Sequence, residues 1–174
     1  MFDIIKINLK TGCATIPIQA KSKKEFSVVG NELKNKIKQL FGGRSLHVRQ
    51  IDAGSCNGCE LEISALSNPI YDIERFGIHF VASPRHADVL LVTGPITRQM
   101  EPALIKTYEA TPEPRIVIAT GDCAINCGVY VNSYAVSGPL NTIIPVDVNI
   151  PGCPPNPTAI LQALLSILDR LPKK

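Results

Sequence analysis

The sequence lacks any long hydrophobic run. Two of its longest continuous apolar stretches, 89–92 and 116–119, have four residues each, whereas a helix that spans a bilayer needs roughly 18 or more. The amino-terminal end also lacks the uninterrupted apolar stretch of a secretory signal, because Asp3, Lys6 and Lys10 interrupt it. We therefore expect a chain that does not cross a membrane by itself, is not secreted, and works in a reducing compartment.

The sequence also lacks low-complexity repeats and the composition of a disordered chain. Of its 174 residues, 45% are hydrophobic and 19% are charged, which is the ordinary globular range. Its Ser, His and Asp residues show no arrangement typical of a hydrolase. A chain of this length commonly forms one compact unit, so we expect a single domain that buries a hydrophobic core.

Positive charge is concentrated near the amino terminus. Residues 1–50 contain ten Lys and Arg against three Asp and Glu, whereas the rest of the chain is net acidic and the total is only +3. Such a basic segment can face anionic lipid, nucleic acid or an acidic partner, although a solvated helix face explains it equally well.

Residues 1–44 have the patterns of one strand and one helix. Apolar and polar residues alternate over 5–9, which predicts a half-buried strand. Residues 22–41 begin with the capping-box pair Ser22 and Glu25, and apolar residues recur at helical spacing until two glycines end the pattern. Because the helices of the main sheet should already cover it, we expect this apolar stripe to dock on another subunit near a membrane, with its lysines facing the headgroups.

After residue 44 the pattern changes to short apolar runs separated by helical stretches. The runs 46–51, 89–92, 115–119 and 143–148 are typical of core strands, and 101–109 is typical of a helix. A last helix is predicted to have Asn156 as its N-cap and Pro157 at its first position. Strands that alternate with helices predict an α/β fold, here a single flavodoxin-like domain with a mainly parallel sheet over 45–174.

The chemistry of the chain lies in its cysteines: Cys13, Cys56, Cys59, Cys123, Cys127 and Cys153. A disulfide framework is disfavoured in a reducing compartment and in a domain that has a sufficient core. Cys56, Cys123 and Cys153 each follow a predicted strand, so parallel strands would bring them together beside Cys59. One C-x-x-C pair with two distant single cysteines favours an iron–sulfur cluster over zinc, which usually takes paired knuckles, but zinc stays open.

Six motifs occur in the order seen in a known family: SCNGCE at 55–60, SPRHAD at 83–88, TGP at 93–95, PEPR at 112–115, GDCA at 121–124 and PGCPP at 151–155. On these motifs the chain resembles the small electron-transfer subunit shared by energy-converting nickel–iron hydrogenases and respiratory complex I. The resemblance covers about residues 45–171. It implies one 4Fe-4S cluster with Cys56, Cys59, Cys123 and Cys153 as ligands.

Two details refine the resemblance. Complex I subunits have two adjacent cysteines where Asn57 and Gly58 separate the pair in this chain, so the hydrogenase branch is the closer match. The family usually has Gly-Gly around 127–128, where this chain has Cys127-Gly128. The motif match favours Cys123 over Cys127 as the ligand, and Cys127 remains the alternative. Cys13 lies outside the resemblance and is expected to be an inert thiol.

Two further residues are candidates for roles beside the cluster. Glu60 follows a ligand cysteine and is a candidate proton relay, although carboxylates also occur at helix starts because the helix dipole favours them. Arg85 and His86 follow an expected strand end, and Arg85 is the preferred candidate to tune the cluster because its charge is permanent. The alternative for Arg85 is a surface ion pair with Asp88.

The resemblance implies an oxidoreductase subunit that is not catalytic alone. It would pass electrons beside a large nickel–iron-type catalytic subunit, with a ferredoxin-like iron–sulfur subunit and integral membrane subunits as further partners and no nucleic acid. The expected setting is a membrane-bound hydrogenase linked to ferredoxin, formate or carbon monoxide, with the chain held peripherally on the cytoplasmic face. The alternatives are a quinone- or sulfur-reducing complex I relative that lacks nickel, and a zinc-stabilised interaction module.

Overall fold

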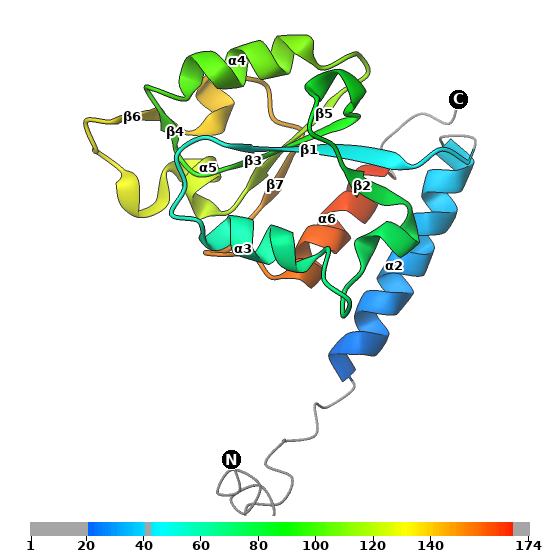
Figure 1. Ribbon diagram of the computed structural model, residues 1–174. Coiled ribbons are helices and arrows are strands. Elements are labelled where there is room, and N and C mark those ends of the chain that lie inside the picture. Colours follow the sequence, from blue (N-terminus) through cyan, green and yellow to red (C-terminus); the bar gives the residue numbers. More distant parts are fainter. Residues whose placement is uncertain (1–20, 41–42, 169–174) are drawn as a thin grey trace, which may run out of the picture.

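The computed structural model describes residues 21–40 and 43–168 (Figure 1). The elements up to the centre of the sheet are α2 (Lys21–Leu40), β1 (Leu46–Asp52), α3 (Gly58–Ala65), the 3-10 helix η1 (Ile73–Phe76), β2 (Ile78–Phe80), η2 (Pro84–His86) and β3 (Val89–Thr93). The remaining elements are β4 (Ile96–Thr97), α4 (Glu101–Ala110), β5 (Ile116–Thr120), α5 (Asp122–Asn126), η3 (Gly128–Tyr130), β6 (Val136–Gly138), η4 (Leu140–Thr142), β7 (Val148–Ile150) and α6 (Pro157–Leu168). None of the helices described here is long and apolar enough to cross a bilayer.

Five parallel strands form the main sheet in the order β2-β1-β3-β5-β7. This is the flavodoxin-like strand order, so the predicted α/β class is confirmed. The central strands β3 and β5 are buried along their whole length, as expected of parallel strands that are covered on both faces. A separate two-stranded antiparallel sheet of β4 and β6, which the sequence patterns did not predict, lies beyond the carboxyl end of β3.

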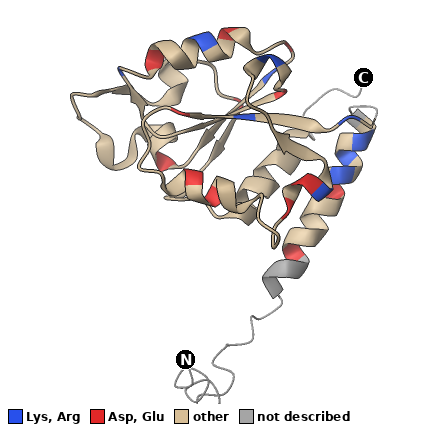
Figure 2. Cartoon of the chain, viewed as in Figure 1, with Lys and Arg blue, Asp and Glu red and all other residues tan. Residues whose placement is uncertain are grey.

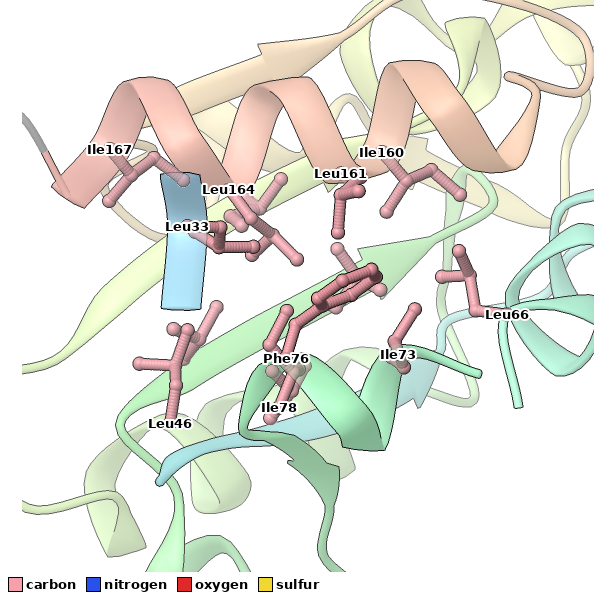
Figure 3. Close-up of a cluster of buried hydrophobic side chains, with 14 of the residues drawn as sticks. Leu33, Leu46, Leu66, Ile73, Phe76, Ile78, Ile160, Leu161, Leu164 and Ile167 are labelled. Atoms are coloured by element: carbon pink, nitrogen blue, oxygen red, sulfur yellow. The ribbon is translucent and has the colours of Figure 1, made fainter. Parts of the chain in front are cut away.

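Helices cover both faces of the sheet and make two hydrophobic cores (Figure 1). The larger core joins one face of the sheet to α2, α3, η1 and α6, and the smaller joins the other face to α4, α5 and η4. In Figure 3 the α6 side chains Ile160, Leu161 and Leu164 face Phe76 and Ile73. The predicted start of α6 is confirmed, since the N–H of Ala159 donates to Asn156 Oδ1 at 2.7 Å.

Helix α2 belongs to the larger core. The side chains of Phe26, Leu33 and Ile37 are buried there, and Leu33 has no exposed surface. Figure 3 shows Leu33 among the α6 side chains. The expectation that the apolar stripe of residues 22–41 docks on another subunit is therefore wrong for these three residues. They pack against α6 and η1, and local sequence patterns do not reveal contacts between such distant segments. The predicted strand 5–9 lies outside the described residues.

The predicted strand at 143–148 is also wrong in its position. Ile143 and Ile144 instead close the turn after η4, with their N–H groups donating to the carbonyl of Leu140, and Ile144 packs in the smaller core. Pro145 has no N–H for a sheet, so regular pairing begins only afterwards, in β7. The bounds of the strand β2 were not predicted, because three residues carry too little periodicity.

Gly30 in α2 provides a test of this packing. A Cβ at Gly30 would lie 2.2 Å from Cζ of the buried Phe76 ring. Alanine normally stabilises a helix interior by about 1 kcal/mol over glycine, but overpacking a core costs about 1–3 kcal/mol. We expect Gly30→Ala to lower the free energy of unfolding in a denaturant titration. Asn31→Ala, on the exposed face of the same helix, should leave it unchanged or slightly raised. Equal stability of Gly30→Ala and the parent would contradict the packing of α2 against η1.

Candidate functional site

Four cysteines gather at one edge of the main sheet. Cys56 follows β1, Cys59 is the second residue of α3, Cys123 is the second residue of α5 after β5, and Cys153 follows β7. Because the strands are parallel, the segments that leave them share the carboxyl edge of the sheet. Cys59 and Cys123 are buried, whereas Cys56 and Cys153 are exposed. The site therefore has a buried side and a side open to the surface.

The loop between β1 and α3 is shaped by its own polar groups. The carboxylate oxygen Oδ1 of Asp52 accepts the N–H groups of Gly54 and Ser55 at 2.8 and 2.7 Å. Asn57 then adopts a left-handed conformation with φ 70°, and α3 begins at the next residue. This turn places Cys56 before the helix and Cys59 in its first turn, so both thiols lie close to the end of β1.

Hydrogen bonds join the loops after β5 and β7. The N–H of Asp122 donates to the carbonyl of Gly152 at 2.9 Å, and the N–H of Gly152 donates to Asp122 Oδ1, also at 2.9 Å. The N–H of Gly121 donates to the carbonyl of Ile150 at 2.8 Å. These bonds position Cys123 and Cys153 relative to each other.

Two glycines leave room for the sulfur atoms. A Cβ at Gly121 would lie 2.7 Å from Cys59 Sγ, and a Cβ at Gly128 would lie 2.9 Å from Cys123 Sγ. Both glycines have positive φ, 86° and 48°, which other residues rarely adopt. A side chain at either position would fill the space beside the thiols, so the site needs glycine for two independent reasons.

The four thiols influence one another electrostatically. Burial, with Glu60 and the other three cysteines adding smaller contributions, raises the pKa of Cys59 to about 12. Burial, then Cys153 and Cys56, raises the pKa of Cys123, while an N–H bond from the backbone opposes this shift. Each thiolate disfavours the next because like charges repel. A cation that binds all four would remove this penalty.

Cys127 lies apart from this group. It is buried, and its pKa is raised by burial alone rather than by the other thiols. It ends α5 in a left-handed conformation with φ 67°, and its N–H donates to the carbonyl of Cys123 at 3.0 Å. The structure thus brings Cys123, and not Cys127, to Cys56, Cys59 and Cys153. Cys13 lies outside the described residues.

Glu60 lies beside the thiols and is buried. Its Oε1 accepts a hydrogen bond from the Thr93 hydroxyl at the end of β3. Its Oε2 is buried and has no hydrogen-bond partner within the described part of the chain. Sequence reasoning missed Thr93 and Asp122, and the signal for both was a polar residue at the carboxyl end of a core strand or just beyond it. The proton-relay role of Glu60 stays a prediction.

Arg85 and His86 are not brought to the cysteines. Both are exposed on η2, which leads into the amino end of β3, and in a parallel sheet that edge is opposite to the one that holds the thiols. The position of Arg85 therefore does not support the expected tuning role. The alternative pairing of Arg85 with Asp88 is not what the structure shows either, because Asp88 Oδ1 pairs with Arg44 at 2.8 Å.

The donor set suits soft metals. Four thiols can hold zinc or an iron–sulfur cluster, and the clearances at Gly121 and Gly128 keep the space beside two of them open. In the ranges 21–40 and 43–168, no three His, Cys, Asp or Glu side chains are grouped as they would be around a single metal ion.

Comparison with known proteins gives consistent results. Residues 56–167 match the family described as NADH ubiquinone oxidoreductase, 20 Kd subunit. The chain is 51% identical over 143 residues to a probable membrane-bound hydrogenase subunit, mbhJ, of Pyrococcus furiosus, which covers 81% of this chain and 86% of that protein. It is 42% identical over 159 residues to formate hydrogenlyase subunit 7 of Escherichia coli, which covers 91% of this chain and 60% of that protein.

A solved structure has the same fold. One chain of the membrane-bound sulfane sulfur reductase, an archaeal respiratory membrane complex, matches with a TM-score of 0.65 and 37% sequence identity. The match covers 79% of this chain and 74% of that chain. The relatives thus include subunits of both hydrogen-linked and sulfur-linked complexes.

Thiol reactivity can test the geometry of the site. In the reduced, iron-free chain near pH 8, we expect iodoacetamide to label the exposed Cys56 and Cys153 first. Cys59 should be the slowest of the four, because its pKa of about 12 leaves little reactive thiolate. Its labelling should accelerate as the pH rises. The free energy of unfolding of the iron-free chain should fall between about pH 9 and pH 12, because over this range the thiol of Cys59 ionises freely only in the unfolded state. Peptide mass spectrometry over time measures this order, and equal rates for Cys56 and Cys59 would contradict it.

Proposed function

The chain belongs to the NADH ubiquinone oxidoreductase 20 Kd subunit family, and from that premise we propose that it carries one 4Fe-4S cluster and passes electrons within a membrane-bound oxidoreductase complex. Cys56, Cys59, Cys123 and Cys153 would be the ligands. The observation that carries this proposal is the meeting of four mutually interacting thiols at three strand exits. The clearances at Gly121 and Gly128 support it.

The chain is an oxidoreductase subunit of the complex I-like type. We propose that its complex is an energy-converting hydrogenase with a large nickel–iron-type catalytic subunit, a ferredoxin-like iron–sulfur subunit and integral membrane subunits. The relatives named as a membrane-bound hydrogenase subunit and a formate hydrogenlyase subunit support this assignment. The chain itself would bind peripherally, on the cytoplasmic face.

The residues of the chain have distinct tasks at the proposed centre. When bound, a 4Fe-4S cluster accepts and releases single electrons. Ligation needs thiolates, so the raised pKa of Cys59 means that metal binding must displace its proton. Burial of Cys59 and Cys123 keeps water from one side, and the bond from the Val129 N–H partly offsets the rise that burial causes in the pKa of Cys123. The buried carboxyl group of Glu60, held by Thr93, is placed to exchange a proton beside the site.

A second candidate function is electron transfer in a sulfur-reducing relative that lacks nickel. The similarity to a chain of the sulfane sulfur reductase favours it. Both functions need the same centre in this chain, because the catalytic metal of a hydrogenase would be held by a different subunit. The nickel content of the purified complex separates them, since only the hydrogenase should contain stoichiometric nickel.

The proposal predicts about four iron atoms in this subunit when its complex is purified anaerobically. Cys56→Ala, Cys59→Ala, Cys123→Ala and Cys153→Ala should each lose the cluster, measured as iron content and as the electron paramagnetic resonance signal of the reduced protein. Cys127→Ala is the matched control, since it removes a buried thiol from the same loop and should retain both.

Two results would contradict this prediction in different ways. Stoichiometric zinc without iron would make the chain a zinc-stabilised module. Loss of the cluster in Cys127→Ala, with retention in Cys123→Ala, would show that Cys127 is the ligand.

A further inference from the structure

Two of the three histidines of the chain lie side by side on neighbouring strands. His47 of β1 and His79 of β2 are register partners in the parallel sheet, so their side chains share one face. Their immediate neighbours Leu46 and Ile78 belong to the larger core. Because side chains alternate along a strand, the two histidines point to the other face. Each is the second residue of its strand, so the pair lies at the amino edge of the sheet, opposite the thiols.

Solvent reaches both imidazole rings. The side chains of His47 and His79 are 30% and 40% exposed. On this face, the smaller core takes buried residues from β1, β3 and β5, but within the described ranges it takes none from β2. The pair therefore lies at the open margin of the sheet, where an ion can enter together with its water ligands.

The distance between the two rings suits a shared metal ion. The ring centroids of His47 and His79 are 6.3 Å apart. With Zn–N bonds of about 2.1 Å and about 1.1 Å from a ring nitrogen to the ring centre, two imidazoles on one ion have centroids at most about 6.4 Å apart, and about 5 Å in tetrahedral geometry. Small rotations of two partly exposed side chains close this difference.

A carboxylate lies beside one nitrogen of each ring. Nδ1 of His47 is 3.8 Å from Oδ2 of Asp88, and Nδ1 of His79 is 3.9 Å from Oε1 of Glu74. Asp88 is itself held in place, since it accepts the His47 N–H at 3.0 Å and pairs with Arg44 at 2.8 Å. A carboxylate in this position favours the tautomer with its proton on Nδ1, which leaves the lone pair of Nε2 for a metal. Both rings thus have the surroundings typical of metal-ligating histidines.

The charged groups beside the pair nearly cancel. The carboxylates of Asp88 and Glu74 balance the guanidinium groups of Arg44 and Arg49, which follows His47 by two residues on the same face. Figure 2 shows both signs of charge at η1 and along the adjoining α2. Imidazole nitrogens suit zinc, nickel and copper, whereas magnesium and calcium need oxygen ligands. No third His, Cys, Asp or Glu in the described part of the chain completes a metal-binding group here, so water fills the remaining positions.

We propose that His47 and His79 bind one divalent transition-metal ion, such as zinc, through their Nε2 atoms. This site is separate from the four thiols and does not depend on the proposed cluster. The ion joins the edge strand β2, which has only three residues, to β1 and so stabilises this margin of the sheet. Because the site has two protein ligands and is open to water, the ion binds reversibly.

Nitrogen NMR of isotope-labelled histidine in the full chain tests the proposal. The thiols are first saturated with zinc, so that only later additions report on the histidines. Near pH 7.5, further zinc should shift the Nε2 resonances of His47 and His79 together. His86, exposed on η2 at the same edge of the sheet, is the internal control and should not respond. No shift in a large excess of zinc, or equal shifts of all three histidines, would overturn the proposal.

Single substitutions show whether the two rings share one ion. In His47→Ala, the response of His79 should need roughly tenfold more zinc or greater, since the second ligand of a chelate acts at a high effective concentration. His79→Ala should have the same effect on His47, and His86→Ala is the matched control that should change neither response. Excess zinc should also raise the Tm of the parent and of His86→Ala more than that of His47→Ala or His79→Ala. An undiminished response of the remaining histidine, or equal rises of Tm in all four proteins, would contradict a shared ion.

Discussion

The central constraint on this chain is that four sulfur atoms must meet at one edge of a parallel sheet. Burial, and secondly the negative charges of neighbouring groups, raise the pKa of Cys59 and of Cys123, so these thiols resist ionisation. Hydrogen bonds, including the reciprocal pair between Asp122 and Gly152, hold the cysteine-bearing loops together despite this penalty. A positively charged metal centre would complete the balance, because it favours the thiolates that the metal-free site disfavours.

The two hydrophobic cores supply the rigidity that this arrangement needs. The buried strands β3 and β5 lie at the centre of the sheet, and strand exits on either side of β3 hold the thiols. Helix α2 adds Phe26, Leu33 and Ile37 to the core on the face shared with α3 and α6. Because α3 begins with the C-x-x-C turn, the packing that stabilises the fold also positions a pair of sulfurs.

Charge is distributed in a way that agrees with a subunit inside a larger assembly. The lysines and arginines of residues 1–50 give that part of the chain a net positive charge, whereas the segment 123–146 beside the thiols is uncharged. Desolvating an uncharged surface costs far less than desolvating charged groups. The face near the proposed cluster is thus suited to permanent burial, and the basic part is suited to contacts with anionic surfaces.

The sequence by itself determined the fold class, the helices α2, α4 and α6, the three strands β1, β3 and β5, and the gathering of Cys56, Cys59, Cys123 and Cys153. Periodicity, caps and the parallel-sheet rule are local or topological, so they can be evaluated without knowing how distant segments pack. Only the tertiary structure decided the rest. It placed α2 against α6, moved the last strand beyond Pro145, separated Cys127 from the other thiols, paired Glu60 with Thr93, and put Arg85 at the opposite edge of the sheet. Each of these outcomes depends on contacts between residues far apart in the chain or on which end of a strand a loop adjoins, and no local pattern records either.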